Sequence, residues 1–255
     1  MGLPLPFTEA GRRSTGRVAG PARDAAHPCR RCEAVRDAAL CGALTADDFQ
    51  RLTALRCHAE LRADITVFRE GDIADHLYSV SSGTMKLYKL LSDGRRQIIG
   101  FLFPGDLFGL AIGGGYAYTA ETVTACQVCR FSYRKFAMLT ERLPGVERNM
   151  LSIAVKDLVA AQEQMLLLGR KTAREKLASF LLKLSRRKRD RGLDGGVVEL
   201  PMSRADIADY LGLTIETVSR TFTHFKRDGI IGLPSHDQVV IADNAALEHV
   251  AESDH

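Results

Sequence analysis

The spacing of apolar residues changes along this chain, and the changes predict its elements. Residues 65–132 hold short apolar runs separated by glycine turns, which is typical of the strands of a sandwich or jelly roll. Residues 144–168 instead carry apolar side chains three and four positions apart, which predicts one long helix. The remaining C-terminal part reads as shorter helices with strands near 197–200 and 238–241. The pattern therefore predicts an α+β chain in which a β-rich part precedes a long helix and a smaller helical part.

The long helix presents a regular apolar seam. Pro144 suits its first turn. The seam positions, which run over about two and a half heptads, are Leu151, Ala154, Leu158, Ala161, Met165 and Leu168. A second copy of the helix can pack along such a seam, and the alternative is a helix packed only on its own domain.

Two short helices joined by a tight turn are predicted over residues 203–229. Ser203 with Asp206 resembles a capping box at the start of the first helix, and Gly212 suits its end. Thr214 can cap the second helix. The side chains predicted to face inward from the second helix are Ile215, Val218, Phe222 and Phe225.

The opposite face of the second helix carries side chains that suit the edges of DNA bases, namely Glu216, Thr217, Ser219, Arg220 and Thr223. Arginine can bridge guanine O6 and N7, glutamate can accept from cytosine N4, and serine or threonine can serve either. Residues 170–230 hold 14 Lys/Arg against 8 Asp/Glu, whereas the remainder holds 21 against 23. A basic C-terminal third suits double-stranded DNA as a partner, although an ordinary surface helix pair would look similar.

The composition and the known motifs limit the cellular location and the class of this protein. No run of about 18 apolar residues occurs, so no membrane span is expected. The N-terminus lacks the apolar core of a signal peptide, and we expect a cytoplasmic protein whose cysteines stay reduced or bind metal. The motifs H-E-x-x-H and G-x-S-x-G and the P-loop are missing, and the 7 histidines are scattered. We therefore expect no enzyme.

Three of the 6 cysteines form the pattern C-x2-C-x8-C near the N-terminus, at Cys29, Cys32 and Cys41. Two cysteines separated by two residues can bind one metal centre. A short helix over residues 33–40 can bring the third cysteine, Cys41, back to the same centre. A four-cysteine site needs one more thiolate from elsewhere. Small core residues, a redox-active thiol pair and a structural zinc site remain alternatives.

The candidates for a fourth thiolate are Cys57, Cys126 and Cys129. Residues three apart in an extended strand face opposite sides, so only one of Cys126 and Cys129 should reach a shared metal site. Cys57 lies among apolar residues, which favours a structural role.

The second helix of the pair resembles the recognition helix of the Crp/Fnr family of bacterial transcription regulators, especially its FNR branch. The pattern E-x-x-S-R, at Glu216, Ser219 and Arg220, follows Y-L-G-L-T at 210–214. The resemblance runs from about Cys29 to about Leu247. It implies that these three residues read a TTGAT-type half-site, that the long helix forms a homodimer, and that the regulator, expected to be an activator, contacts RNA polymerase.

The resemblance also implies the domain organisation. The fold would be an N-terminal double-stranded β-helix of the cyclic-nucleotide-binding type (a jelly roll), a long dimerisation helix and a C-terminal winged helix-turn-helix. The expected units are a disordered N-terminus at 1–28, a cysteine-bearing segment with the β-roll at 29–142, the dimerisation helix at 143–169 and the DNA-binding domain at 170–255. The glycine-rich residues 113–115 would be a flexible surface loop that touches RNA polymerase.

In the FNR branch, three N-terminal cysteines and one from the sensory domain hold an oxygen-labile [4Fe-4S] cluster. The resemblance assigns these ligands to Cys29, Cys32, Cys41 and Cys129, and leaves Cys126 in the core. The eight residues before Cys41 depart from the five of the best-known form. The alternative is a regulator of the same family without a cluster, responding to a small ligand, haem, nitric oxide or thiol oxidation.

A cyclic nucleotide is not the expected ligand. In nucleotide-responsive relatives an Arg-Ser pair holds the cyclic phosphate, and the corresponding positions here are Tyr116 and Ala117. Gly109 is followed by Leu110 instead of the usual glutamate. A buried phosphate without a cation is costly.

Overall fold

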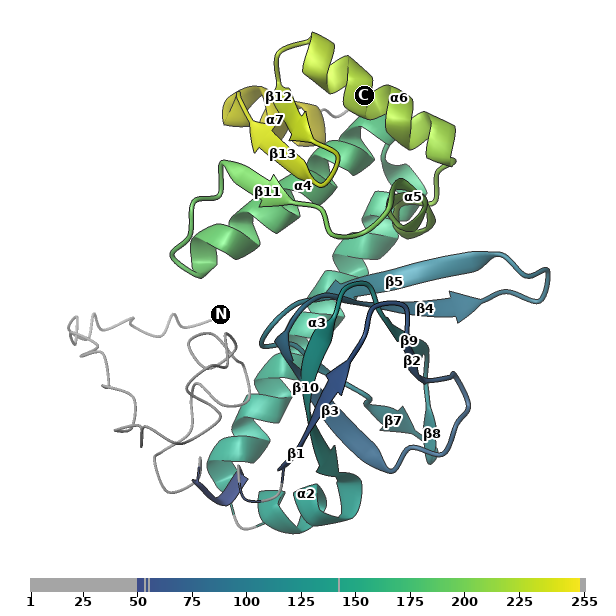
Figure 1. Cartoon of the computed structure of the whole chain (residues 1–255), viewed down its shortest axis with the longest axis vertical. Coiled ribbons are helices and arrows are strands. Elements are labelled where there is room, and N and C mark those ends of the chain that lie inside the picture. The colour runs from purple at the N-terminus through teal and green to yellow at the C-terminus, as the bar shows by residue number, and fades with distance from the viewer. Residues whose placement is uncertain (1–49, 53, 55, 142, 253–255) are drawn as a thin grey trace, which may run out of the picture.

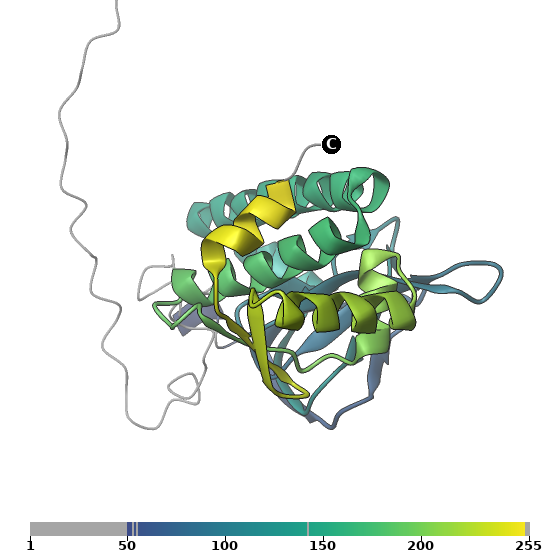
Figure 2. The ribbon, with the colours of Figure 1, turned by 90° about the horizontal axis from the view of Figure 1, so that it is seen from above.

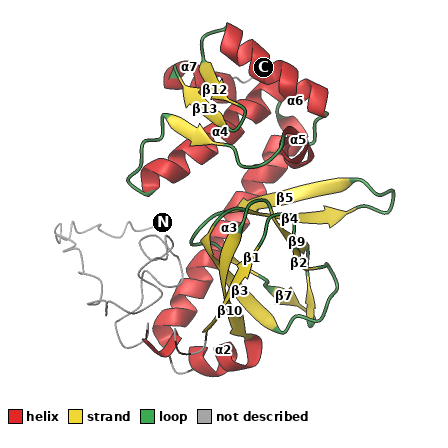
Figure 3. Ribbon diagram, in the orientation of Figure 1, coloured by secondary structure: helices red, strands yellow, loops and turns green. Residues whose placement is uncertain are grey.

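The computed structural model describes residues 50–252, apart from residues 53, 55 and 142. These residues form a β-roll (residues 56–132), a long helix and a C-terminal head (residues 173–252) (Figure 1, Figure 3). The long helix runs along the roll and ends beneath the head, so that it connects the two (Figure 1). The predicted order of strands, long helix and helical head is confirmed.

The roll consists of two four-stranded antiparallel sheets with the strand orders β1-β10-β3-β6 and β2-β9-β4-β5. Phe68, Val80 and Met85 from the two sheets are buried in one apolar core, which is the packing expected of a jelly roll. The strands are β1 (Arg56–Leu61), β2 (Thr66–Phe68), β3 (His76–Ser82), β4 (Met85–Leu90), β5 (Arg96–Leu102), β6 (Leu107–Phe108), β7 (Ala111–Ile112), β8 (Gly115–Tyr116), β9 (Thr119–Thr122) and β10 (Cys126–Ser132).

Residues 113–115, expected to form a flexible surface loop, lie in a hairpin whose turn, at Gly113 and Gly114, is exposed. β7 pairs with β8, and Gly113 and Gly114 turn the chain between them with φ values of 64° and 88°. Glycine adopts positive φ without steric cost, which explains the composition of this turn. The Tyr116 N–H donates to the Asp72 carbonyl at 3.0 Å and joins the hairpin to the roll.

Two helices follow the roll, α2 (Tyr133–Thr140) and α3 (Pro144–Arg170). The 27 residues of α3 give it a length of about 40 Å. Val146, Ile153 and Leu167 are buried along one side of α3. Within the described part of the chain, no helix is long and apolar enough to cross a membrane.

The head has a helical core and a three-stranded sheet of order β11-β13-β12. Its elements are α4 (Ala173–Asp190), β11 (Val197–Glu199), α5 (Arg204–Leu211), α6 (Ile215–Arg227), β12 (Ile231–Ser235), β13 (Gln238–Ile241) and α7 (Asn244–Glu252). The hairpin β12–β13 confirms the predicted wing. Leu177 and Leu181 of α4 are buried with Ile207 of α5 and Val218 of α6, so one core holds the helices together. Figure 2 shows the head from above, with the β4–β5 hairpin of the roll reaching out past it.

Candidate DNA interface and sensory site

The two helices α5 and α6 are built from the local signals that predicted them. The Ser203 hydroxyl accepts from the Asp206 N–H at 3.0 Å and the Asp206 carboxylate accepts from the Ser203 N–H at 3.2 Å, which completes the capping box. Gly212 ends α5 with φ 61°. The Thr214 hydroxyl then accepts from the Thr217 N–H at 3.2 Å and starts α6.

The inner face of α6 holds it against the rest of the head. Val218, Phe222 and Phe225 are buried as predicted. Ile215 is 48% exposed, so its predicted inward position is wrong. The first turn of α6 extends beyond the core of the head, and Thr221 is buried instead, with its hydroxyl donating to the Thr217 carbonyl at 2.7 Å.

The outer face of α6 presents the predicted base-reading side chains. Glu216, Ser219 and Arg220 are exposed, and Thr217 is half-buried. Arg220 Nε donates to the Glu216 carbonyl at 3.4 Å. Hydrogen bonds from its own backbone N–H and from Thr214 lower the pKa of Glu216, with a smaller contribution from Arg220. A carboxylate acceptor and a guanidinium donor therefore lie one helical turn apart on an open helix face.

A stripe of apolar side chains lies exposed along α3. Of the predicted seam, Leu151, Leu158 and Met165 are 66%, 60% and 71% exposed, and Leu168 is half-buried. Ala154 and Ala161 are also exposed. Three further exposed apolar side chains on the same helix were not part of the predicted seam: Val155, Val159 and Leu166. Each of these three residues directly follows a seam position in the sequence, and this pattern could have predicted a wider apolar stripe.

Cys129 lies outside the core of the roll, in a second apolar cluster that includes residues of α3. The Cys129 cluster, as we call it, consists of Leu52, Leu77, Leu107, Cys129, Phe131, Phe136, Leu143, Val146 and Ile153. The Cys129 thiol is 3.3 Å from the Ser81 hydroxyl. Cys126 belongs to the core of the roll, where its thiol donates to the Thr84 carbonyl at 3.3 Å. The prediction that these two cysteines face opposite sides of β10 is confirmed.

The other cysteines divide into one that is described and three that are not. Cys57 is exposed and pairs across β1 and β10 with the exposed Arg130, so the structural role predicted for it is wrong. Directly paired residues lie on the same face of a sheet, so Cys57 and Arg130 share an exposed part of that face. Cys29, Cys32 and Cys41 lie outside the described residues. Among the residues that are described, no three histidine, cysteine or acidic side chains gather as a metal site.

Aromatic rings fill the interior of the roll next to the position expected for a cyclic phosphate. The Tyr116 ring stacks on Phe68 with centroids 3.7 Å apart, and Tyr78 stacks on Phe108 at 5.0 Å. The Tyr116 hydroxyl donates to the His76 carbonyl at 2.9 Å, and burial raises its pKa. A neutral phenol thus stands where nucleotide-responsive relatives carry a cation.

We predict that millimolar cyclic AMP leaves both the melting temperature and the DNA affinity unchanged. A ligand that binds only the folded state raises its stability by mass action, and here the neutral Tyr116, stacked on Phe68, provides no cation for the cyclic phosphate. Calorimetry with and without the nucleotide measures this directly. A rise of several degrees in the melting temperature would contradict the prediction.

A winged helix-turn-helix head, a long helix with an exposed apolar stripe and a β-roll together define a DNA-binding transcription regulator with a separate β-roll domain. Comparisons with known proteins identify its family. Residues 58–142 match the model of the cyclic nucleotide-binding domain, and residues 175–250 match the Crp-like helix-turn-helix domain.

The chain is 43% identical over 227 residues to the nitrogen fixation regulation protein FixK of Bradyrhizobium diazoefficiens, covering 88% of this chain and 94% of the relative. It is 37% identical over 232 residues to the transcriptional activator protein FnrL of Cereibacter sphaeroides, covering 89% and 94%. The solved structure of FixK2 from Bradyrhizobium japonicum superposes with a TM-score of 0.73 at 37% identity, covering 78% of this chain and 99% of that one. The chain belongs to the Crp/Fnr family of transcription regulators, and it is therefore a DNA-binding regulator rather than an enzyme.

Proposed function

We propose that this regulator is an oxygen-responsive activator that binds a TTGAT-type palindrome as a homodimer when oxygen is scarce. In this proposal Cys29, Cys32, Cys41 and Cys129 hold a [4Fe-4S] cluster, and the DNA-bound dimer contacts RNA polymerase. The observation that carries the proposal is the buried thiol of Cys129 beside Leu52, at the point where the chain leaves the cysteine-bearing segment. A bound cluster supplies an oxygen-labile link among the four thiolates.

The N-terminal cysteines are close enough in sequence to reach Cys129. Nine positions separate Cys41 from Gln50, the first described residue. An extended chain covers about 3.4 Å per residue, so this segment can span up to about 30 Å. Leu52 lies in the Cys129 cluster, and the distance left for the segment to cover is therefore well within its reach.

The Cys129 cluster also includes side chains of the long helix, which gives the sensory site a route to the dimer. Val146 and Ile153 of α3 pack in the cluster with Cys129 and Leu52. Holding the N-terminal segment at Cys129 would order this contact and favour one arrangement of α3. The energetic demand is modest, because a bias of about 1.4 kcal/mol changes a dimer equilibrium tenfold.

The proposal is tested by purifying the protein under nitrogen and measuring iron, sulfide, the visible spectrum and DNA affinity before and after exposure to air. We expect about four iron and four sulfide per chain, a visible absorption that bleaches in air, and a parallel loss of DNA binding. Iron-free protein that binds the palindrome equally well under nitrogen and in air would refute the cluster. It would favour a cluster-free regulator that responds to a small ligand or to thiol oxidation.

We predict that Arg220→Ala weakens binding to the cognate site by about 1–3 kcal/mol and relaxes base choice at one position of the half-site. The reason is the exposed guanidinium of Arg220 on the open face of α6. The measurement is affinity against a panel of half-sites with single-base changes. Arg227→Ala is the matched control, because Arg227 is also exposed on α6 and pairs with Asp228 at 3.2 Å. An equal loss on every panel member would mean that Arg220 contacts only phosphate.

A further inference from the structure

Charged side chains join the head directly to the roll. Lys86 Nζ of β4 lies 3.0 Å from Asp206 Oδ1 of α5, and Arg96 Nη2 of β5 lies 2.9 Å from the same oxygen. Arg96 also binds Asp209 Oδ2 at 2.8 Å. We call these four residues the junction ion pairs. Figure 1 shows α5 directly above β5, where the pairs form.

A second polar contact lies just beyond the other end of β5. Arg187 of α4 pairs with Asp106 at 2.7 Å, and Arg191 donates a hydrogen bond to the Pro104 carbonyl. β5, from Arg96 to Leu102, is about 20 Å long, so the two contacts lie near opposite ends of this strand. A body held at one point can turn about that point, whereas two separated points leave only rotation about the line between them. The chain itself, which passes from α3 into α4, is a third connection, so the head is held in a defined orientation on the roll.

Two of the three junction ion pairs involve Asp206, in the first turn of α5. The Asp206 carboxylate completes the capping box with Ser203. The same carboxylate also forms ion pairs with Lys86 and Arg96. The side chains of Lys86 and Asp206 are 7% and 8% exposed. Burial alone would raise the pKa of Asp206, but hydrogen bonds from Ser203 and Lys86 outweigh it and hold the pKa below its usual value. The roll thus contacts an ionised carboxylate in the first turn of α5, the first helix of the helix-turn-helix.

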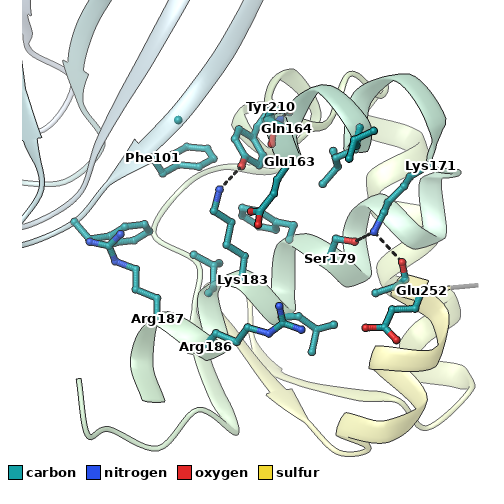
Figure 4. Close-up of a pocket in the computed structure, with 18 of the residues that line it drawn as sticks. Phe101, Glu163, Gln164, Lys171, Ser179, Lys183, Arg186, Arg187, Tyr210 and Glu252 are labelled. Atoms are coloured by element: carbon teal, nitrogen blue, oxygen red, sulfur yellow. Dashed lines mark hydrogen bonds between the residues drawn. The ribbon is translucent and has the colours of Figure 1, made fainter. Parts of the chain in front are cut away.

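The apolar contacts between the roll and the head stabilise their association but do not fix their relative orientation. Ile98 and Tyr88 of the roll are buried in the core cluster of the head, and apolar contact is non-directional. Next to them lies a cavity of about 660 Å³ lined by Phe101, Phe180 and Tyr210 and by parts of α3 and α4 (Figure 4). Packing is therefore incomplete between the long helix and the head. Charge-assisted hydrogen bonds have preferred distances and angles, so they are the contacts that select one orientation.

We infer that Lys86 and Arg96 are positioning residues for DNA binding, which hold α6 at a set orientation relative to α3 and thereby select the spacing between two half-sites. The inference rests on the homodimer proposed above, because a spacing is defined only for two joined heads. Lys86 and Arg96 belong to the roll and touch α5 rather than α6. Their loss should alter spacing preference and leave base preference unchanged, whereas loss of Arg220 should do the reverse.

The test compares palindromes whose half-sites are moved together or apart in single base-pair steps, with the full chain under nitrogen. The measured quantity is the ratio of affinity at the best spacing to affinity at the neighbouring spacings. We expect Arg96→Asp to lower this ratio about tenfold, in the usual range for coupled charged residues. The double variant Arg96→Asp/Asp209→Arg restores opposite charges between positions 96 and 209 but leaves a carboxylate beside Asp206, so it should recover part of the ratio.

Lys89→Asp is the matched control, since Lys89 lies on the same hairpin and pairs with Glu70 within the roll at 2.5 Å. It should leave the spacing ratio unchanged. If Arg96→Asp does not fold, Arg96→Ala removes the charge without reversing it and should show a smaller loss of the same kind.

Two outcomes would overturn the inference while leaving the dimer intact. One is an Arg96→Asp protein that is dimeric and keeps the full spacing ratio. The other is an equal loss at every spacing and on a single half-site, because a merely structural role lowers all affinities alike. A wild-type protein that is monomeric under nitrogen and shows no spacing preference would instead refute the homodimer, and the inference would fall with it.

Discussion

Replacing Cys129 by serine is expected to abolish cluster assembly and, with it, the difference in DNA affinity between nitrogen and air. A serine hydroxyl stays protonated at neutral pH and cannot replace a thiolate ligand. Cys129 is buried in the Cys129 cluster beside Leu52 and Ile153, so its loss removes the proposed anchor of the N-terminal segment. Iron and sulfide after anaerobic reconstitution should fall from about four each per chain to near zero.

Cys126→Ser and Cys57→Ser are the controls for this prediction. Cys126 lies in the core of the roll and donates to the Thr84 carbonyl, a hydrogen bond that a serine hydroxyl can also make. Cys57 is exposed on the edge strand β1. Both variants should therefore retain iron, sulfide and the response to air. A Cys129→Ser protein that still assembles a full cluster would refute the ligand assignment.

The parts of the fold that sequence predicted well are those specified by neighbouring residues. The capping box at Ser203, the left-handed glycine at Gly212 and the cap at Thr214 all form as expected. Each depends on a hydrogen bond or a backbone preference within three or four positions, so the sequence contains all of its determinants. The reading face of α6 follows directly, because its caps set which residues point away from the core.

Burial was harder to predict, because it depends on what covers a side chain. Ile215 and Cys57 both sit in apolar surroundings in the sequence, and both are exposed. Ile215 precedes the part of α6 that packs on the core of the head, and Cys57 lies on an exposed part of its sheet beside Arg130.

The junction ion pairs had no sequence signal. Lys86 and Arg96 are separated from Asp206 by 120 and 110 positions. A lysine and an arginine on short strands look like ordinary surface charges, and most of them are. Only the placement of the head on the roll makes them partners. The fold thus adds a connection from roll to head that is separate from the one through α3.

Replacing Leu158 by aspartate is expected to break the proposed homodimer and to reduce affinity for the palindrome to that of a single half-site. Leu158 lies in the exposed apolar stripe of α3 together with Leu151, Val155, Val159 and Met165. A contiguous apolar stripe of this size on one helix marks an interaction surface. In a symmetric dimer each substitution occurs twice, and burying an unpaired carboxylate costs several kcal/mol. The dimer dissociation constant, measured by ultracentrifugation under nitrogen, should rise on the order of 100-fold or more.

Lys156→Asp is the matched control, because Lys156 is also exposed on α3 and the variant introduces the same side chain outside the apolar stripe. It should leave the dissociation constant within a few-fold of wild type. The melting temperature separates assembly from folding: Leu158 makes few contacts within its own chain, being 60% exposed, so a diluted monomeric Leu158→Asp protein should melt close to wild-type monomer. If Leu158→Asp and Lys156→Asp weakened the dimer equally, the exposed stripe would not be the interface, and a general effect of negative charge on α3 would explain both results.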